Sequence, residues 1–121
     1  MKKNQSCNKQ IKKTLCFLNN KHKIEILYCL SEGTMRFSEI KNCLENITQQ
    51  LLTKQLKQLE HDNLISRNEY DGFPRKVEYS LTSFGITTKS IMNSMIRWEK
   101  KNYRTINTIM KKNPDSLYDY Y

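Results

Sequence analysis

The chain of 121 residues contains few residues that interrupt regular structure and no long apolar segment. Three glycines and two prolines leave little material for interdomain linkers, so we expect a single domain. No apolar run approaches the length of about 18 residues that a membrane-spanning helix needs. Residues 1–5 also lack the hydrophobic segment of a secretion signal, so we expect a cytoplasmic protein that does not enter a membrane.

Residues suited to catalysis or metal binding are equally scarce. Only His22 and His61 could act as a base beside a reactive cysteine, and no phosphate-binding loop or paired-carboxylate motif occurs. The four cysteines show neither CxxC nor Cys/His ligand spacing: Cys7, Cys16, Cys29 and Cys43. We therefore expect no enzyme, no metal site and no cofactor, and we expect thiols in a reducing compartment.

Positive charge is what the chain has in excess. It carries 21 Lys and Arg against 12 Asp and Glu, a net charge of +9, and residues 1–23 hold seven lysines and no acid. Such a surface favours a polyanionic partner such as nucleic acid, although lysines can also serve solubility alone. We expect residues 1–112 to form one domain and residues 113–121 a short tail.

Thr48 to Leu81 is the most informative stretch. Thr48 can cap a helix whose apolar face consists of Leu52, Leu56 and Leu59. The opposite face carries side chains that can reach base edges and phosphates, namely Gln50, Thr53, Lys54, Lys57 and His61. Asp71-Gly72 then signals a hairpin turn before an alternating strand at residues 76–81. A helix followed by a basic hairpin predicts a winged helix-turn-helix that binds DNA.

The rest of the chain is predominantly helical by its apolar periodicity. Helices are predicted after Ser6, from about Lys21 to near Gly33, over residues 37–44, and from a cap at Thr82 to about Lys112. Residues 34–36 are expected to form a short strand beside the hairpin. The predicted fold class is therefore mainly α with a small β-hairpin.

The predicted last helix is too long for so small a domain to cover. Its apolar stripe spans about 30 Å and consists of Met92, Ile96, Tyr103, Ile106 and Met110. Together with Ile11 and Leu15 of the first helix, it predicts a homodimer through the N- and C-terminal helices. Packing wholly within one chain is the alternative. A dimer would bring two recognition helices to successive major grooves.

Several segments occur in an order and spacing that together are specific. They are Cys7 before a helix, Asn19-Asn20-Lys21-His22, Ile26-Leu27, Leu30 to Ile40, Ile47-Thr48, Leu51 to Glu60, Leu64 to Arg67, Pro74, Val77 to Thr82, Gly85 and Trp98. In this order the chain resembles the HxlR family of bacterial transcriptional regulators, a dimeric winged-helix group. Two departures lie near the first helix: Asn8 follows Cys7 where the family usually has proline, and Asn-Asn-Lys-His replaces Gly-Gly-Lys-Trp.

The resemblance implies a regulator that binds double-stranded operator DNA as a homodimer, and we expect a repressor. The expected DNA-binding residues are Arg36, Thr48, Gln49, Gln50, Thr53, Lys54, Lys57, Arg75 and Lys76. Among them, Lys54 and Lys57 suit phosphates, and Gln50 suits an adenine edge. Arg75 and Lys76 flank the wing tip, where they can reach the minor groove. Ordinary solvated surface is the alternative for each.

Cys7 is the cysteine with the clearest expected role. It lies near the expected start of a helix and among lysines, and both features favour the reactive thiolate. In several members of the family an equivalent cysteine senses quinones, aldehydes, hypochlorite or disulfide stress. The resemblance therefore implies that Cys7 senses an electrophile or oxidant, with Cys43 as a partner across the dimer, whereas Cys16 and Cys29 are expected to be buried. The alternatives are that Cys7 only packs against Ile11, or that the regulator answers to a small ligand or is constitutive.

Overall fold

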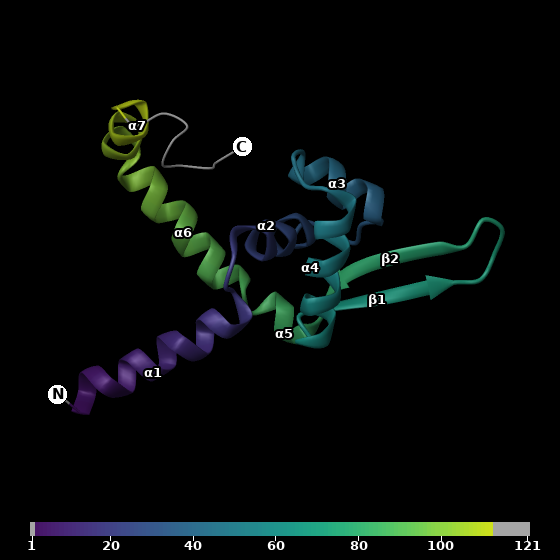
Figure 1. The fold of residues 1–121 in the computed structure, drawn as a ribbon, viewed down its shortest axis with the longest axis horizontal. Helices are drawn as coiled ribbons and strands as arrows, with labels where there is room; N and C mark the ends of the chain where they lie inside the picture. Colours follow the sequence, from purple (N-terminus) through teal and green to yellow (C-terminus); the bar gives the residue numbers. More distant parts are fainter. Residues whose placement is uncertain (1, 113–121) are drawn as a thin grey trace.

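Seven helices and a two-stranded sheet follow one another over residues 2–112, the part of the chain that this computed structural model describes. The elements are α1 (Lys2–Phe17), α2 (Lys21–Leu30), α3 (Phe37–Leu44), α4 (Gln49–His61), β1 (Ile65–Tyr70), β2 (Lys76–Leu81), α5 (Ser83–Ile86), α6 (Lys89–Lys101) and α7 (Tyr103–Lys112) (Figure 1). The predicted fold class, mainly α with a β-hairpin, is confirmed. The predicted tail at residues 113–121 lies outside the described residues.

The two strands form an antiparallel hairpin. Ile65 pairs with Leu81 at its base and Tyr70 with Lys76 near its tip. The short strand expected at residues 34–36 is present as a single bridge between Met35 and Tyr79, whose backbone N–H groups each donate to the other's carbonyl at 3.0 and 2.8 Å. This bridge joins the start of α3 to the hairpin.

The hydrophobic core lies among α2, α3, α4 and the base of the hairpin. Its fully buried side chains come from each of these elements: Ile26, Leu27, Ile40, Leu52, Leu56, Leu59, Leu64 and Ile65. Three of them are the leucines whose spacing predicted the inner face of α4. Their burial removes apolar surface from water and fixes which face of α4 is left outside.

The last helix is not continuous, and this part of the prediction is wrong. Thr82 does cap a helix, since its Oγ1 accepts from the Gly85 N–H at 2.9 Å, but that helix is α5 and it ends at Ile86. The Thr88 hydroxyl donates to the Gly85 carbonyl before α6 begins. The Asn102 side chain donates to the Trp98 carbonyl between α6 and α7. Such side chains compete with the backbone for helical carbonyls and favour a break.

The first helix begins at Lys2, earlier than the predicted start after Ser6. Lysine and glutamine propagate a helix well, which explains the extension. α1 contacts α5 through an edge-to-face pair between Phe17 and Phe84, whose ring centroids are 5.8 Å apart.

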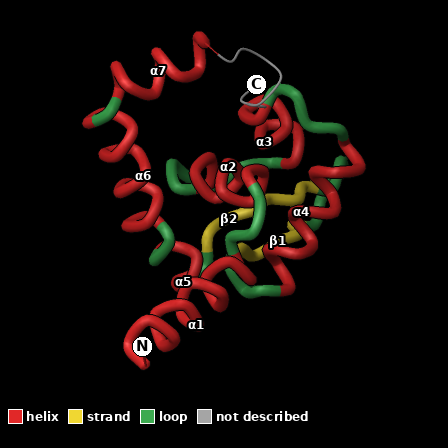
Figure 2. The backbone as a smooth tube through the Cα atoms, turned by 60° about the vertical axis from the view of Figure 1, so that its left-hand side comes forward, coloured by secondary structure: helices red, strands yellow, loops and turns green. Residues whose placement is uncertain are grey.

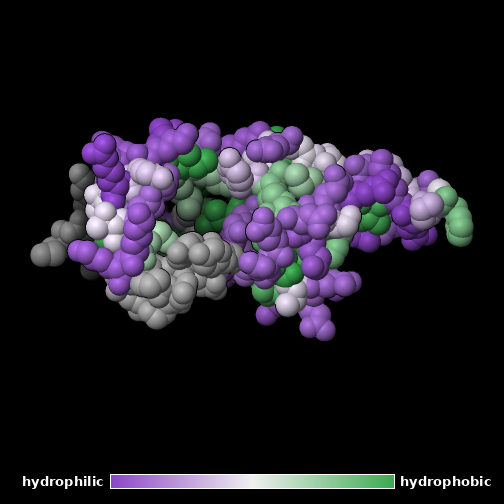
Figure 3. All heavy atoms as spheres, turned by 90° about the horizontal axis from the view of Figure 1, so that it is seen from above, coloured by the Kyte–Doolittle hydropathy of each residue, from purple (hydrophilic) through white to green (hydrophobic). Residues whose placement is uncertain are grey.

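The terminal helices extend away from the body of the domain. Figure 1 shows α1 and the α6–α7 arm projecting on the side opposite the hairpin, and Figure 2 shows the arm to one side of α2 and α3. Figure 3 shows hydrophobic residues in a hollow between the arm and the body. Among residues 2–112, no helix has the length and apolar character needed to cross a membrane.

Candidate nucleic-acid interface

α4 presents its polar face outward because its other face is buried. Thr48 caps the helix as predicted, its Oγ1 accepting from the Leu51 N–H at 3.1 Å. The inner face consists of the three buried leucines and Gln55. The outer face exposes the predicted DNA-binding residues Gln49, Gln50, Lys54 and Lys57. The N-terminal end of the helix, with its free N–H groups, is open to a phosphate.

The Thr53 side chain is less exposed than the sequence predicts, and its hydroxyl already has a hydrogen-bond partner. It is half-buried, and its hydroxyl donates to the Gln49 carbonyl at 2.8 Å. Its oxygen and methyl group remain able to contact a base. Thr48, Gln49, Gln50 and Thr53 together line a shallow depression of about 610 Å³ at the start of α4. This depression gathers four of the predicted residues in one place.

The basic residues of the wing are paired with acids of the same hairpin. Arg75 lies 3.5 Å from Glu69, and Lys76 lies 3.2 Å from Glu78. Arg67 also donates to Glu69. The hydrogen bond from Arg67, together with the charges of Arg67 and Arg75, lowers the pKa of the Glu69 carboxyl. A phosphate that approaches the wing must therefore compete with these carboxylates.

The lysines of α4 differ from those of the wing. Lys54 and Lys57 are exposed and form no ion pair with any residue that the structure describes. Their charge is available to a polyanion without the loss of an internal partner. Arg36 is also exposed, and its backbone N–H donates to Glu39 at 3.0 Å at the start of α3. It lies where α3 begins, next to Met35 of the bridge to the hairpin.

A part-buried polar contact that sequence reasoning missed fixes α4 against α2. Asn20 caps α2, its side-chain oxygen accepting from the Lys23 N–H at 2.9 Å. Its amide nitrogen donates to Gln55 on α4 at 3.1 Å, and Gln55 is only 5% exposed. The signal was present in two features: an Asn at an N-cap position and a polar residue on the apolar face of α4. Their pairing required the fold.

Gly85 sets the distance between α5 and the base of the wing. A Cβ atom at this position would lie 2.0 Å from the Leu64 carbonyl oxygen. The same carbonyl accepts from the Thr82 N–H at 3.1 Å. Only glycine permits this approach, so Gly85 belongs to the support of the wing and not to its DNA-contacting surface.

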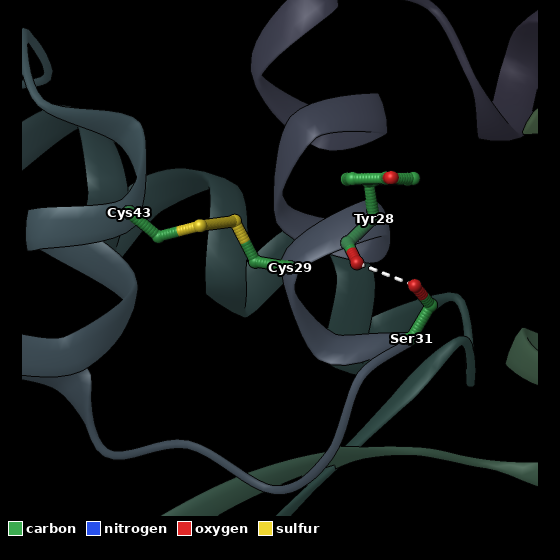
Figure 4. Close-up of a disulfide and its surroundings, with 4 residues drawn as sticks. All are labelled: Tyr28, Cys29, Ser31 and Cys43. Carbon is green, nitrogen blue, oxygen red and sulfur yellow. Dashed lines mark hydrogen bonds between the residues drawn. A yellow bond between two sulfur atoms is a disulfide. The ribbon is translucent and has the colours of Figure 1, made fainter. Parts of the chain in front are cut away.

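Two cysteines are joined by a disulfide that the sequence did not predict. Cys29 on α2 and Cys43 on α3 are bonded, with Cα atoms 6.6 Å apart (Figure 4). Cys43 in this state is not available to Cys7 of a second chain, contrary to the expected pairing. Cys29 is buried as predicted, whereas Cys16 is exposed and that prediction is wrong. Cys16 points outward because α1 projects from the body.

Cys7 is exposed, as a sensor requires. However, α1 starts at Lys2, which places Cys7 beyond the first helical turn. The field of a helix terminus falls off within one turn, so the helix-dipole argument for thiolate formation no longer applies.

The predicted dimer residues fall into three groups by their exposure. Ile11 and Leu15 on α1 and Tyr103 on α7 are more than half exposed, whereas Ile96 and Ile106 are half-buried. Met92 is 5% exposed and belongs to the core, so its assignment to a dimer interface is wrong. The apolar spacing predicts one continuous surface, but the first turn of α6 packs on α2. Other large apolar side chains on α6 are exposed, among them Met95 and Trp98.

Comparison with known proteins places this geometry among regulators. A family model of HxlR-like helix-turn-helix proteins matches residues 17–107. The regulatory protein MalR of Fusobacterium mortiferum is 45% identical over 93 residues, 76% of this chain and 88% of MalR. The redox regulator HypR in its reduced form superposes with a TM-score of 0.77 at 36% identity, covering 82% of this chain and 98% of HypR. Its oxidised form gives a TM-score of 0.73 at 39% identity, covering 77% and 96%.

Proposed function

The chain belongs to the HxlR-like helix-turn-helix family and is a transcriptional regulator, and on this basis we propose that it binds operator DNA sequence-specifically as a homodimeric repressor. α4 enters the major groove, and the hairpin lies over the adjacent minor groove. The observation that carries this proposal is the polar outer face of α4, which exposes glutamines beside two lysines that form no ion pair within residues 2–112.

Each residue on this face has a role in the proposal. Gln50 offers the donor and acceptor pair that recognises adenine in the major groove. Lys54 and Lys57 contact phosphates on either side, and Thr48 and Gln49 lie where the free N–H groups of the helix start can hold a phosphate. Arg75 and Lys76 extend the contact from the wing, and Arg36 reaches the backbone from the start of α3.

The homodimer is supported by the apolar surface of the terminal helices. Ile11 and Leu15 on α1, and Met95, Trp98 and Tyr103 on α6–α7, are between 48% and 64% exposed. A surface of this kind on projecting helices is typical of an interface. A two-fold dimer also spaces two recognition helices one helical turn of DNA apart.

A thiol response through Cys7 is the second part of the proposal. Cys7 is exposed on the same helix as the dimer residues Ile11 and Leu15. Alkylation or oxidation there would alter the packing of the terminal helices and hence the separation of the two recognition helices. The similarity to HypR, named as a redox regulator in both reduced and oxidised forms, supports such a response.

A titration of labelled duplexes by fluorescence anisotropy tests the DNA proposal. The protein should bind its own upstream region at least 1,000-fold more tightly than random duplex, the lower limit of about 10³ for specific regulators. Gln50→Ala should change the preferred base at one position in each half-site. Equal affinity for both duplexes, or a light-scattering mass equal to the single-chain 14.5 kDa, would refute a specific dimeric regulator.

A regulator controlled by a small ligand is the second candidate. The observation that favours it is an apolar cavity of about 650 Å³ between α2, α3 and α6. The two candidates differ in one measurement. If Cys7 is the sensor, a quinone should lower the DNA affinity of the parent protein and leave that of Cys7→Ser unchanged. If a small ligand controls the regulator, the quinone should affect the DNA affinity of both proteins alike.

A further inference from the structure

Cys29 and Cys43 lie on the two helices that precede α4. Their disulfide joins the end of α2 to α3, and the Tyr28 ring points away from it (Figure 4). Cys29 is 5% exposed and packs in the core, whereas Cys43 is exposed. The Cys43 end of the bond is therefore at the surface, and the Cys29 end is held in place by the surrounding side chains.

The crosslink lies close to the DNA-reading face along the chain. Residues 44–47 alone separate Cys43 from Thr48, the cap of α4. α3 is eight residues long and contributes two buried side chains, Ile40 and Leu44. α3 packs mainly against α2, so a covalent bond between the two helices changes how firmly α3 and the turn into α4 are held.

Small molecules can reach the pair. The cavity of about 650 Å³ between α2, α3 and α6 is lined by both cysteines. Its walls are mainly apolar, with Ile24 and Met95 on opposite sides and Glu25 also contributing. A hollow of this volume has room for a small oxidant beside the two sulfurs.

We propose that Cys29 and Cys43 form an intrachain dithiol–disulfide pair that a small two-electron oxidant closes, and that closure holds α3 and the start of α4 in the arrangement seen here. The pair is distinct from Cys7 and withholds Cys43 from a second subunit. The consequence for DNA affinity depends on the proposed function, whereas the formation of the bond does not.

The reaction balances with diamide as the oxidant. The Cys43 thiolate adds to the N=N bond of diamide, and that nitrogen pair takes up one proton. The Cys29 thiolate then attacks Sγ of Cys43, the S–N bond breaks, and the hydrazine product leaves with a second proton. Two thiols thus lose two protons and two electrons to the N=N bond, and one S–S bond is formed.

Peptide mapping of the full-length protein after stoichiometric diamide tests the bond itself. We expect a single-chain band on a non-reducing gel, two remaining free thiols out of four, and one linked peptide pair containing Cys29 and Cys43. Cys7→Ser/Cys16→Ser should give the same linked pair, and Cys43→Ser should abolish it. A Cys7–Cys43 link between chains, or four free thiols after treatment, would overturn the proposal.

DNA affinity then tests the effect of closure. In Cys7→Ser/Cys16→Ser, which keeps only this pair, oxidation should tighten operator binding at least about fivefold, the lower end of typical coupling between sites. Adding Cys43→Ser at its exposed position should remove that change, with circular dichroism confirming the fold. Equal affinity of the oxidised and reduced forms would refute the effect on α3. Absence of specific DNA binding by the reduced parent would instead count against the proposed function. The peptide mapping would still decide whether Cys29 and Cys43 form the bond.

Discussion

Replacing Lys57 with alanine should make DNA binding measurably less sensitive to salt. Lys57 is exposed on α4 and has no ion-pair partner in the described part of the chain, so a phosphate contact there displaces a counterion from DNA without releasing an internal acid. Each such contact contributes about 0.9 to the slope of log K against log[salt]. In a two-fold dimer the substitution removes two contacts, and the slope should become shallower by about 1.8.

The wing gives an internal comparison. Lys76 lies 3.2 Å from Glu78. When Lys76 pairs with a phosphate, Glu78 loses its partner and binds a cation from solution, which offsets the counterion released from DNA. The net release of ions is then small, and Lys76→Ala should change the slope by less than about 0.9 for the dimer. The two lysines therefore have different expected slopes although both were predicted to contact DNA.

Anisotropy titrations between 50 and 200 mM KCl measure these slopes. A slope difference of about 1.8 means that the affinity gap between the parent and Lys57→Ala narrows about 12-fold over this range. Lys111→Ala, on α7 far from α4 in Figures 1 and 2, is the matched control and should match the parent. Equal slopes for Lys57→Ala, Lys111→Ala and the parent would refute the assignment of α4 as the phosphate-contacting face.

Three further predictions concern the residues that support α4 and the wing. Gly85→Ala should destabilise the fold by about 3 kcal/mol, because its Cβ would meet the Leu64 carbonyl oxygen at 2.0 Å; urea unfolding measures this. Asn20→Ala should cost about 2 kcal/mol in the same assay, because it removes a helix cap and leaves buried Gln55 without its donor. The Glu69 carboxyl should titrate by NMR with a midpoint below 4.5. Since its folded pKa is lowered, its contribution to wing stability is present above that value and is lost as the pH falls through the folded pKa.

Neighbouring positions supply the controls. Ser83→Ala, on the exposed first residue of α5, should stay within about 0.5 kcal/mol of the parent. Asn19→Ala should be similarly mild, because Asn19 does not cap α2 and its exposed side chain only accepts a 3.3 Å hydrogen bond from the Asn20 amide. A loss as large as that of Gly85→Ala or Asn20→Ala at these positions would contradict the structural reasons given. For Glu69, a midpoint at or above 4.5 would show that the guanidinium groups do not hold the carboxylate in solution.

Local signals were sufficient for the elements that carry the site. The leucine spacing of α4, its Thr48 cap and the alternation of β2 each depend on residues a few positions apart. Helix caps, helical faces and tight turns depend on contacts between residues that are close in the sequence. The sequence alone therefore predicts this helix, its cap and the hairpin. The outward position of Lys54 and Lys57 could be predicted because they lie on the side of α4 opposite its buried leucines.

What the sequence by itself determined is therefore the kind of protein: helical periodicity, capping and turn chemistry are properties of adjacent residues and require no fold. Only the tertiary structure decided which distant residues meet. The contact of Asn20 with Gln55, the bond between Cys29 and Cys43, and the burial of Met92 all join segments that periodicity treats separately. Each results from the packing of α2 against α3, α4 and α6, and that packing is set by the whole core at once.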